Sequence, residues 1–136
     1  MIRQRQKLES NMRTSPDFDT TFQQLKAIFE PYRSRLIVSA ESDSLFSLEV
    51  DHVMKNKHRL YFGGVRKGKA YVSFHLMPVY SCPEIESQIS ADLKKRMQGK
   101  SCFNFCQPDA KLFKELAKIT KLGFKTFTDK EFYSRF

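Results

Sequence analysis

The chain contains no tryptophan, only three cysteines, and no long apolar run. Its longest clean aliphatic stretch is 36–38, far shorter than the roughly 20 residues that span a bilayer, so we expect no membrane partner. An odd number of cysteines without a C-x-x-C pair argues against a disulfide framework. Residues 1–7 carry positive charge without a following apolar stretch, so we expect no secretory signal. These absences together predict reduced thiols and a cytoplasmic location.

The residues that are present suit one globular domain. The chain has 136 residues, of which 40% are apolar and 29% charged, and 13 are phenylalanine. This length can bury a real core without disulfides or metals, and the composition is not that of a disordered chain. Residues 1–14 are polar and show no periodicity, so we expect a flexible basic arm there. We expect a single domain over residues 15–136, with a core built on phenylalanine.

The net charge of +9 is unevenly distributed. Residues 14–51 carry a net charge of −4, whereas residues 52–128 carry +10. A basic surface of this kind attracts anionic partners and speeds their encounter. Nucleic acid is the usual large polyanion that such a surface binds. Positive charge can also serve solubility alone, and by itself it does not discriminate between base sequences.

Apolar periodicity predicts most of the secondary structure. Ser15-Pro16-Asp17 is typical of a helix start, and apolar residues at helical spacing continue to Tyr32, where Pro31 ends the pattern. Extended segments are expected at 36–42 and 45–53, the second with strict alternation of apolar and polar residues.

A hairpin is expected next, with strands at 60–66 and 69–79 joined at Lys67-Gly68. This turn places Tyr61 opposite Phe74 and Val65 opposite Ala70. It directs an apolar face toward the core and a mixed face away from it, and a slip by one residue would reverse the two faces. The inward residues are Tyr61, Val65, Val72 and Phe74, and the outward residues are Phe62, Tyr71, Ser73 and His75.

The rest of the chain adds helices and one strand. A helical stretch from Cys82 to Gly99 is expected either as one helix or as two short ones, the second capped by Ser90. A short strand at 101–106 precedes a long helix that starts at Pro108 and ends at Gly123. This order predicts an α+β domain, with an antiparallel sheet of about five strands and helices packed on one face.

The mixed hairpin face is the first candidate binding site. Phe62, Tyr71, Ser73 and His75 combine aromatic walls with polar anchors, which is typical of small-molecule pockets. The same register would bring His58 near His75, but no metal-ligand spacing accompanies them, and structural histidines are common at strand ends. We therefore expect no metal or cofactor.

Lysines form the second candidate site. Five of them fall along one side of the last helix, and a second basic cluster precedes the short strand. A solvated helix face opposite the core explains such a stripe better than a partner site does, and no stacking aromatics are interleaved with it. The residues of this basic patch are Lys111, Lys114, Lys118, Lys121 and Lys125, with Lys94, Lys95 and Arg96.

Catalysis has the least support. The paired glycines at 63–64 match neither a dinucleotide-binding nor a Walker loop, and no helix follows them to hold a phosphate. The acidic pairs are solvated, and the scattered histidines and cysteines form no set of nucleophile, base and orienting group. We assign no catalytic residue.

Several segments resemble a known family. They are the first helix, the hairpin sequence at 65–74, Leu93-Lys94-Lys95-Arg96-Met97, the strand sequence at 100–105 and the closing helix. Over residues 17–125 the chain resembles the YdhG-like family of bacterial domains of unknown function. The resemblance implies one α+β domain, a cytoplasmic location and no agreed enzymatic activity. Some relatives are described as frataxin-like iron chaperones, but iron prefers clustered oxygen ligands and the acids here are scattered, so no residue is given that role.

Three functions follow from these patterns. The first is a non-catalytic module that binds a small molecule or a protein through the mixed hairpin face. The second is a nucleic-acid-associated protein that uses the basic patch. The third, which follows from the resemblance, is a metal-handling protein.

Overall fold

The computed structural model describes residues 17–136. The basic arm expected at residues 1–14, and the helix-start residues Ser15 and Pro16, lie outside this range. Within it, the first helix α2 (Phe18–Phe29) begins after Asp17, whose carboxylate accepts a hydrogen bond from the Thr20 backbone N–H. Pro31 ends the α-helical geometry, and the chain continues as the 3₁₀ helix η1 (Glu30–Arg35).

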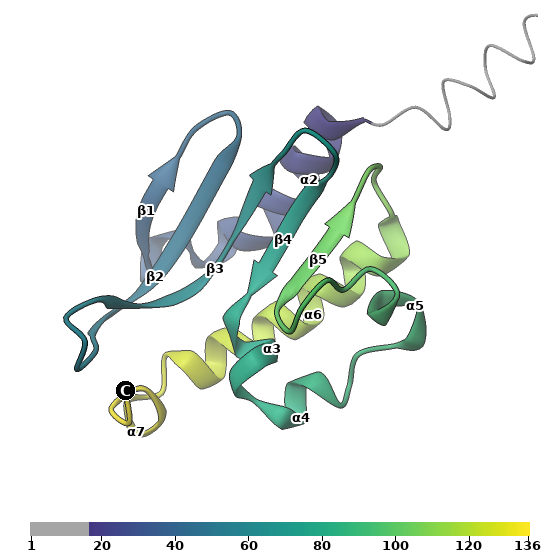
Figure 1. The fold of residues 1–136 in the computed structure, drawn as a ribbon. Coiled ribbons are helices and arrows are strands. Elements are labelled where there is room, and N and C mark those ends of the chain that lie inside the picture. Colours follow the sequence, from purple (N-terminus) through teal and green to yellow (C-terminus); the bar gives the residue numbers. More distant parts are fainter. Residues whose placement is uncertain (1–16) are drawn as a thin grey trace, which may run out of the picture.

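Five strands form one antiparallel sheet in the described part of the chain, and each strand pairs with the next one in sequence. Helices α2 and α6 cover one face of this sheet, while the short helices α3 to α5 connect its fourth and fifth strands (Figure 1). The predicted α+β fold is therefore confirmed. The strands are β1 (Ile37–Glu41), β2 (Leu45–Val53), β3 (Arg59–Lys67), β4 (Val72–Leu76) and β5 (Cys102–Phe105).

The helices after β4 refine the sequence prediction. The strand expected at 69–79 was too long: β4 covers only Val72–Leu76, because residues 68–71 form the turn and α3 (Met77–Ser81) follows at once. The stretch from Cys82 onward forms two short helices, and the Ser90 hydroxyl accepts a hydrogen bond from the Leu93 N–H, which confirms its capping role. These helices are α4 (Pro83–Glu86) and α5 (Ala91–Lys94), and they are followed by α6 (Ala110–Phe127) and α7 (Lys130–Tyr133).

The register of the central hairpin differs from the prediction by four residues. Val65 pairs with Phe74, not with Ala70, because the connection is longer than a two-residue turn and is closed by a Gly68 N–H to Tyr71 carbonyl hydrogen bond of 3.0 Å. An even shift keeps every side chain of β4 on its expected face. Val65, Val72 and Phe74 are therefore buried as predicted.

A β-bulge in β3 corrects two of the predicted orientations. Leu48 pairs with Gly63 but Glu49 pairs with Tyr61, which leaves Phe62 as an extra residue in the ladder. Phe62 is thereby directed into the core, where it is fully buried between rings of Phe29 and Phe127. Tyr61, which was expected to point inward, lies instead on the outer face of the sheet near Gly64.

Helix α6 extends past its predicted end. It runs to Phe127, and Gly123 is a buried contact point inside it. A Cβ atom at Gly123 would lie 2.7 Å from both Cβ and Cγ of Pro78 in α3. The absence of a side chain at Gly123 therefore lets α3 pack closely on α6. The glycine serves this contact and does not mark the end of the helix, as the sequence alone had indicated.

We expect Gly123→Ala to destabilise the protein by about 1–3 kcal/mol, because the new methyl group overlaps the rigid Pro78 ring. Alanine in place of glycine at an unobstructed helix position would stabilise by up to about 1 kcal/mol, so the sign of the change is diagnostic. Urea unfolding measures it, with the exposed Lys114→Ala on the same helix as control. An unchanged or higher stability of Gly123→Ala would contradict this packing.

Candidate functional site

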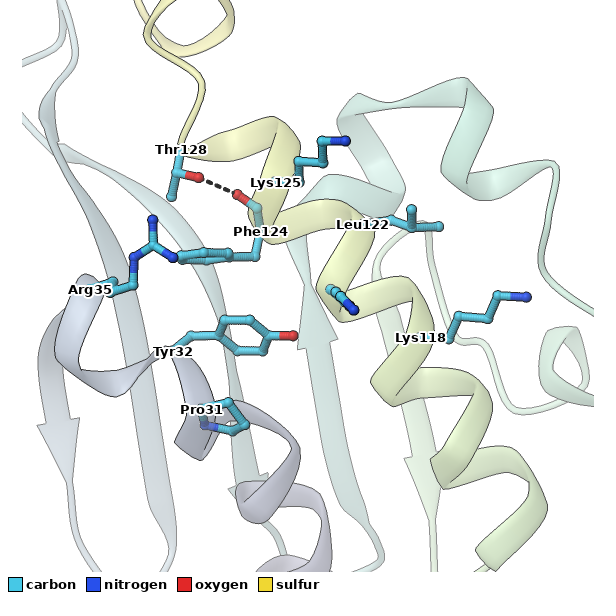
Figure 2. A pocket seen from close by; sticks show the side chains of 9 residues that line it. Pro31, Tyr32, Arg35, Lys118, Leu122, Phe124, Lys125 and Thr128 are labelled. Carbon is cyan, nitrogen blue, oxygen red and sulfur yellow. Dashed lines mark hydrogen bonds between the residues drawn. The ribbon is translucent and has the colours of Figure 1, made fainter.

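An open groove of about 920 Å³ lies between η1 and the C-terminal half of α6. Its floor is apolar and aromatic, and its rim is basic. Figure 2 shows the Tyr32 and Phe124 rings facing each other across the seam, with Arg35 beside them. The lining residues are Pro31, Tyr32, Arg35, Lys118, Lys121, Leu122, Phe124, Lys125 and Thr128.

Local structure places these groups. Residues 118, 121 and 125 recur at helical spacing on one side of α6, and Phe124 lies beside them, one turn after Lys121. Its ring centroid is 4.6 Å from that of Tyr32, which η1 presents directly after Pro31. The Arg35 guanidinium lies 5.0 Å from the Phe124 ring centroid, within range of a cation–π interaction.

The cations of the groove are not paired with carboxylates in the part of the chain that the structure describes. Arg35, Lys118, Lys121 and Lys125 form no ion pair with any residue of the range 17–136. Four free cations around one groove create a field that favours anions.

The acids nearest to η1 are engaged elsewhere. Arg33 binds the carboxylates of both Glu30 and Glu41, and Lys26 lies 2.9 Å from Glu41. The hydrogen bond from Arg33 lowers the pKa of Glu30, and hydrogen bonds from Arg33 and Lys26 lower the pKa of Glu41 to about 2. These carboxylates thus stay ionised and paired on the far side of Arg33. In the groove itself, burial raises the pKa of Tyr32, so its hydroxyl stays protonated at neutral pH.

The structure divides the predicted basic patch. All five lysines of α6 are exposed, but only Lys118, Lys121 and Lys125 line the groove. None of the preceding cluster, Lys94, Lys95 and Arg96, lines it. Lys95 lies 3.9 Å from Asp92, and Arg96 lies over the Phe105 ring.

A second, smaller hollow of about 420 Å³ lies on the outer face of the sheet. It brings together Tyr71, Ser73 and His75, three of the four residues predicted for the mixed hairpin face. Phe62, the fourth, is in the core for the reason given above. The hollow is also lined by Arg66, Lys69 and Cys102, together with Gly68 and Ala70.

The hydroxyl and amide groups at this hollow bond to one another, whereas Arg66 and Lys69 in its lining form no ion pair within residues 17–136. The Ser73 hydroxyl donates to Asn104 Oδ1 at 2.9 Å, and Asn104 Nδ2 donates to Gln98 Oε1 at 2.6 Å. The Tyr71 hydroxyl donates to the same Gln98 oxygen at 3.2 Å. A ligand here would have to compete with this network, whereas an anion in the groove would meet cations without partners.

Tyr61 covers the middle of the outer sheet face. A Cβ atom at Gly64 would lie 3.0 Å from the Tyr61 hydroxyl oxygen, so the phenol rests on the glycine backbone. Burial raises the pKa of Tyr61 to about 12, and a hydrogen bond with Ser47 offsets part of that rise. The bulge therefore places Tyr61 on the outer face of the sheet, where Phe62 was expected, and places Phe62 in the core.

Sequence reasoning missed two juxtapositions. No stacking aromatics were expected to be interleaved with the lysine stripe, yet Tyr32 and Phe124 line the same groove as three of its lysines. The available signal was Phe124, at helical spacing from Lys121. Cys102 lies directly opposite His75, with Sγ 3.7 Å from Nε2, although no histidine–cysteine pair was expected. His58 does not approach His75. His75 pairs with Gly64, whereas His58 precedes the first residue of β3, six residues before Gly64 in the sequence.

Comparison of the chain with protein-family models, with curated proteins and with solved structures yields no match. No helix within residues 17–136 is both long and apolar enough to cross a bilayer. The function must therefore be argued from the geometry of the two surface sites.

Tyr61 should make the folded protein lose stability in strong base. Its pKa of about 12 in the folded chain exceeds the ordinary value of 10.0, so the unfolded chain releases this proton first as pH rises. The stabilisation is complete below about pH 10 and is lost between about pH 10 and pH 12, by up to about 2–3 kcal/mol.

Urea unfolding of the protein and of Tyr61→Phe, at about pH 9 and about pH 11.5, isolates this contribution. The variant, which has no proton to release at this position, should lose less stability over the interval. Equal losses in the two proteins would show that Tyr61 ionises in its ordinary range.

Proposed function

We propose that this protein is a non-catalytic binding module whose groove between η1 and α6 takes a small anionic ligand that carries a flat ring. The observation that carries this proposal is the set of four cations around the Tyr32–Phe124 ring pair, none of which forms an ion pair within residues 17–136. The ring of a ligand would stack against these aromatic side chains, and its negative groups would accept hydrogen bonds from the lysines.

The composition of the groove supports binding without chemistry. Within residues 17–136 its lining contains lysine, arginine, tyrosine, threonine and apolar side chains, and no histidine, cysteine, aspartate or glutamate. It therefore offers charge and shape, but no pairing of a nucleophile with a base and no carboxylic acid for proton transfer. The mixed hairpin face, the site expected from sequence, has less support because its polar groups are already bonded to each other.

A second candidate, nucleic-acid binding, is favoured by the length of the lysine stripe. The stripe continues beyond the groove to Lys114 and Lys111, and at a rise of about 1.5 Å per residue it extends for roughly 20 Å. A line of this length could follow several phosphates of a single strand while one base stacks in the groove. Iron handling is not proposed, since no three potential ligands among His, Cys, Asp and Glu gather anywhere in residues 17–136.

Calorimetric titration with three probes tests the proposal: adenosine triphosphate, inorganic tripolyphosphate and a short thymidine oligonucleotide. We expect adenosine triphosphate to bind more tightly than tripolyphosphate, because only the former has a ring to stack. Lys121→Gln and Arg35→Gln should each weaken its binding about tenfold or more. Tyr32→Leu should weaken adenosine triphosphate and leave tripolyphosphate unaffected.

Lys111→Gln is the matched control, since it removes one lysine of the same stripe outside the groove. It should leave adenosine triphosphate binding within about twofold of the unmodified protein. If the oligonucleotide binds most tightly, loses affinity steeply with salt and is weakened equally by Lys111→Gln and Lys121→Gln, nucleic-acid binding replaces the small-ligand proposal. If none of the probes binds, both candidates are wrong.

A further inference from the structure

The outer face of the sheet pairs a thiol with an imidazole. Cys102 on β5 and His75 on β4 occupy directly opposed positions, and Cys102 Sγ lies 3.7 Å from His75 Nε2. Both side chains are half-buried and line the hollow on the outer face. The thiol also donates a hydrogen bond to Asn104 Oδ1, at 3.3 Å. Sulfur and nitrogen are thus the two strong donor atoms here, and Asn104 Oδ1, which also accepts a hydrogen bond from Ser73, lies beside the sulfur.

The spacing of these atoms fits a shared metal ion. Bonds of the lengths that zinc forms to sulfur and imidazole, about 2.3 Å and 2.0–2.1 Å, would enclose an angle of roughly 115° at an ion bound to these two atoms, which lie 3.7 Å apart. This angle lies between the tetrahedral and the trigonal values. An ion could therefore bridge Sγ and Nε2 without movement of the strands, and the two ligands come from neighbouring strands whose positions the sheet ladder holds.

The number and type of ligands narrow the identity of the ion. Zinc in proteins usually takes four donors, and only two strong ones are present here, with an amide oxygen as a weak third. A soft ion that accepts low coordination and prefers thiolate, such as Cu(I), fits this set better. Hard ions such as Ca²⁺ or Mg²⁺ would need several oxygen ligands, and the lining of the hollow contains no carboxylate.

The surrounding charge points the same way. Arg66 and Lys69 line the hollow, and their positive charge disfavours a further net positive charge beside them. A monovalent ion bound by one thiolate and one neutral imidazole forms a complex without net charge. A divalent ion on the same ligands would leave one positive charge beside Arg66, which is unfavourable.

We propose that Cys102 and His75 form a binding site for a soft monovalent metal ion of the Cu(I) type, on the sheet face opposite the helices. On binding, the Cys102 thiol releases its proton to solvent, a metal–sulfur bond forms in place of the S–H bond, and the His75 Nε2 lone pair completes the coordination. No electron is transferred, because the ion enters and remains as Cu(I). The site does not depend on the groove proposed above, which lies on the helical side.

The chain supplies its own matched controls. Cys106 is the exposed thiol, directly after β5, and its Sγ donates a hydrogen bond to the Ala70 carbonyl at 3.5 Å. His58 is an exposed histidine directly before β3, whereas His75 pairs with Gly64 further along that strand. Cys106→Ser and His58→Gln therefore remove the same chemical groups as Cys102→Ser and His75→Gln, but away from the proposed site.

The test is an anaerobic competition for Cu(I) between the reduced full-length protein and the chromophoric chelator bathocuproine disulfonate. We expect one tightly held equivalent, weakened at least about 100-fold by Cys102→Ser and about tenfold or more by His75→Gln. Cys106→Ser and His58→Gln should bind as the unmodified protein does. Thermal unfolding of each variant without metal checks that the fold is kept, and the conservative substitutions leave the strand ladder intact.

Two further measurements separate this site from general thiol affinity. Copper X-ray absorption should show one sulfur and one imidazole nitrogen bound to the ion in the unmodified protein, with the nitrogen lost in His75→Gln. Zn(II), measured by the same kind of competition, should bind at least about 100-fold more weakly than Cu(I). Equal loss of Cu(I) in Cys106→Ser and Cys102→Ser, no effect of His75→Gln, or Zn(II) binding as tight as Cu(I) would each overturn the proposal.

Discussion

The packing of the Phe29 ring on the backbone at Gly63 is the contact on which the rest of the arrangement depends. A Cβ atom at Gly63 would lie 3.0 Å from Phe29 Cζ and 2.6 Å from the His75 carbonyl oxygen, so neither the helix nor β4 could keep its position. With no side chain there, Phe29 stacks on Phe74, their ring centroids 4.7 Å apart, and meets Phe62 edge-on. The end of α2 is therefore held on the centre of the sheet, and η1 emerges beside α6.

The location of the groove follows from that placement. Because η1 starts where Phe29 is held, Tyr32 and Arg35 reach Phe124 on α6 and close the seam between the two helical elements. Arg33, between them in sequence, turns instead toward Glu30 and Glu41. Glu30 and Glu41 are thus paired with Arg33 and Lys26, and the described lining of the groove carries charge of one sign only.

The bulge at Phe62 has a comparable effect on the opposite side of the sheet. It moves one phenylalanine inward to meet Phe127 and leaves Tyr61 outside, over Gly64. The outer face becomes a polar surface, organised by hydrogen bonds through Asn104 and by the His75–Cys102 pair. The two candidate sites consequently lie on opposite sides of one sheet and rely on different physics: unpaired charge with stacking in the groove, and donor-atom geometry in the hollow.

Local pattern in the sequence was enough to establish the elements and much of the side-chain orientation. Helical spacing predicts α2 and α6, alternation predicts β2 with the bounds it has, and the parity of β4 places Ser73 and His75 outside. These features can be predicted locally, because the direction of a side chain repeats about every 3.6 residues in a helix and every two residues in a strand. Only the tertiary structure decided the four-residue shift of the hairpin, the bulge at Phe62, the extension of α6 past Gly123, and the meetings of Tyr32 with Phe124 and of His75 with Cys102. Each of these results from close packing between segments distant in sequence, where the fit of a ring or the absence of a Cβ atom outweighs the local preference.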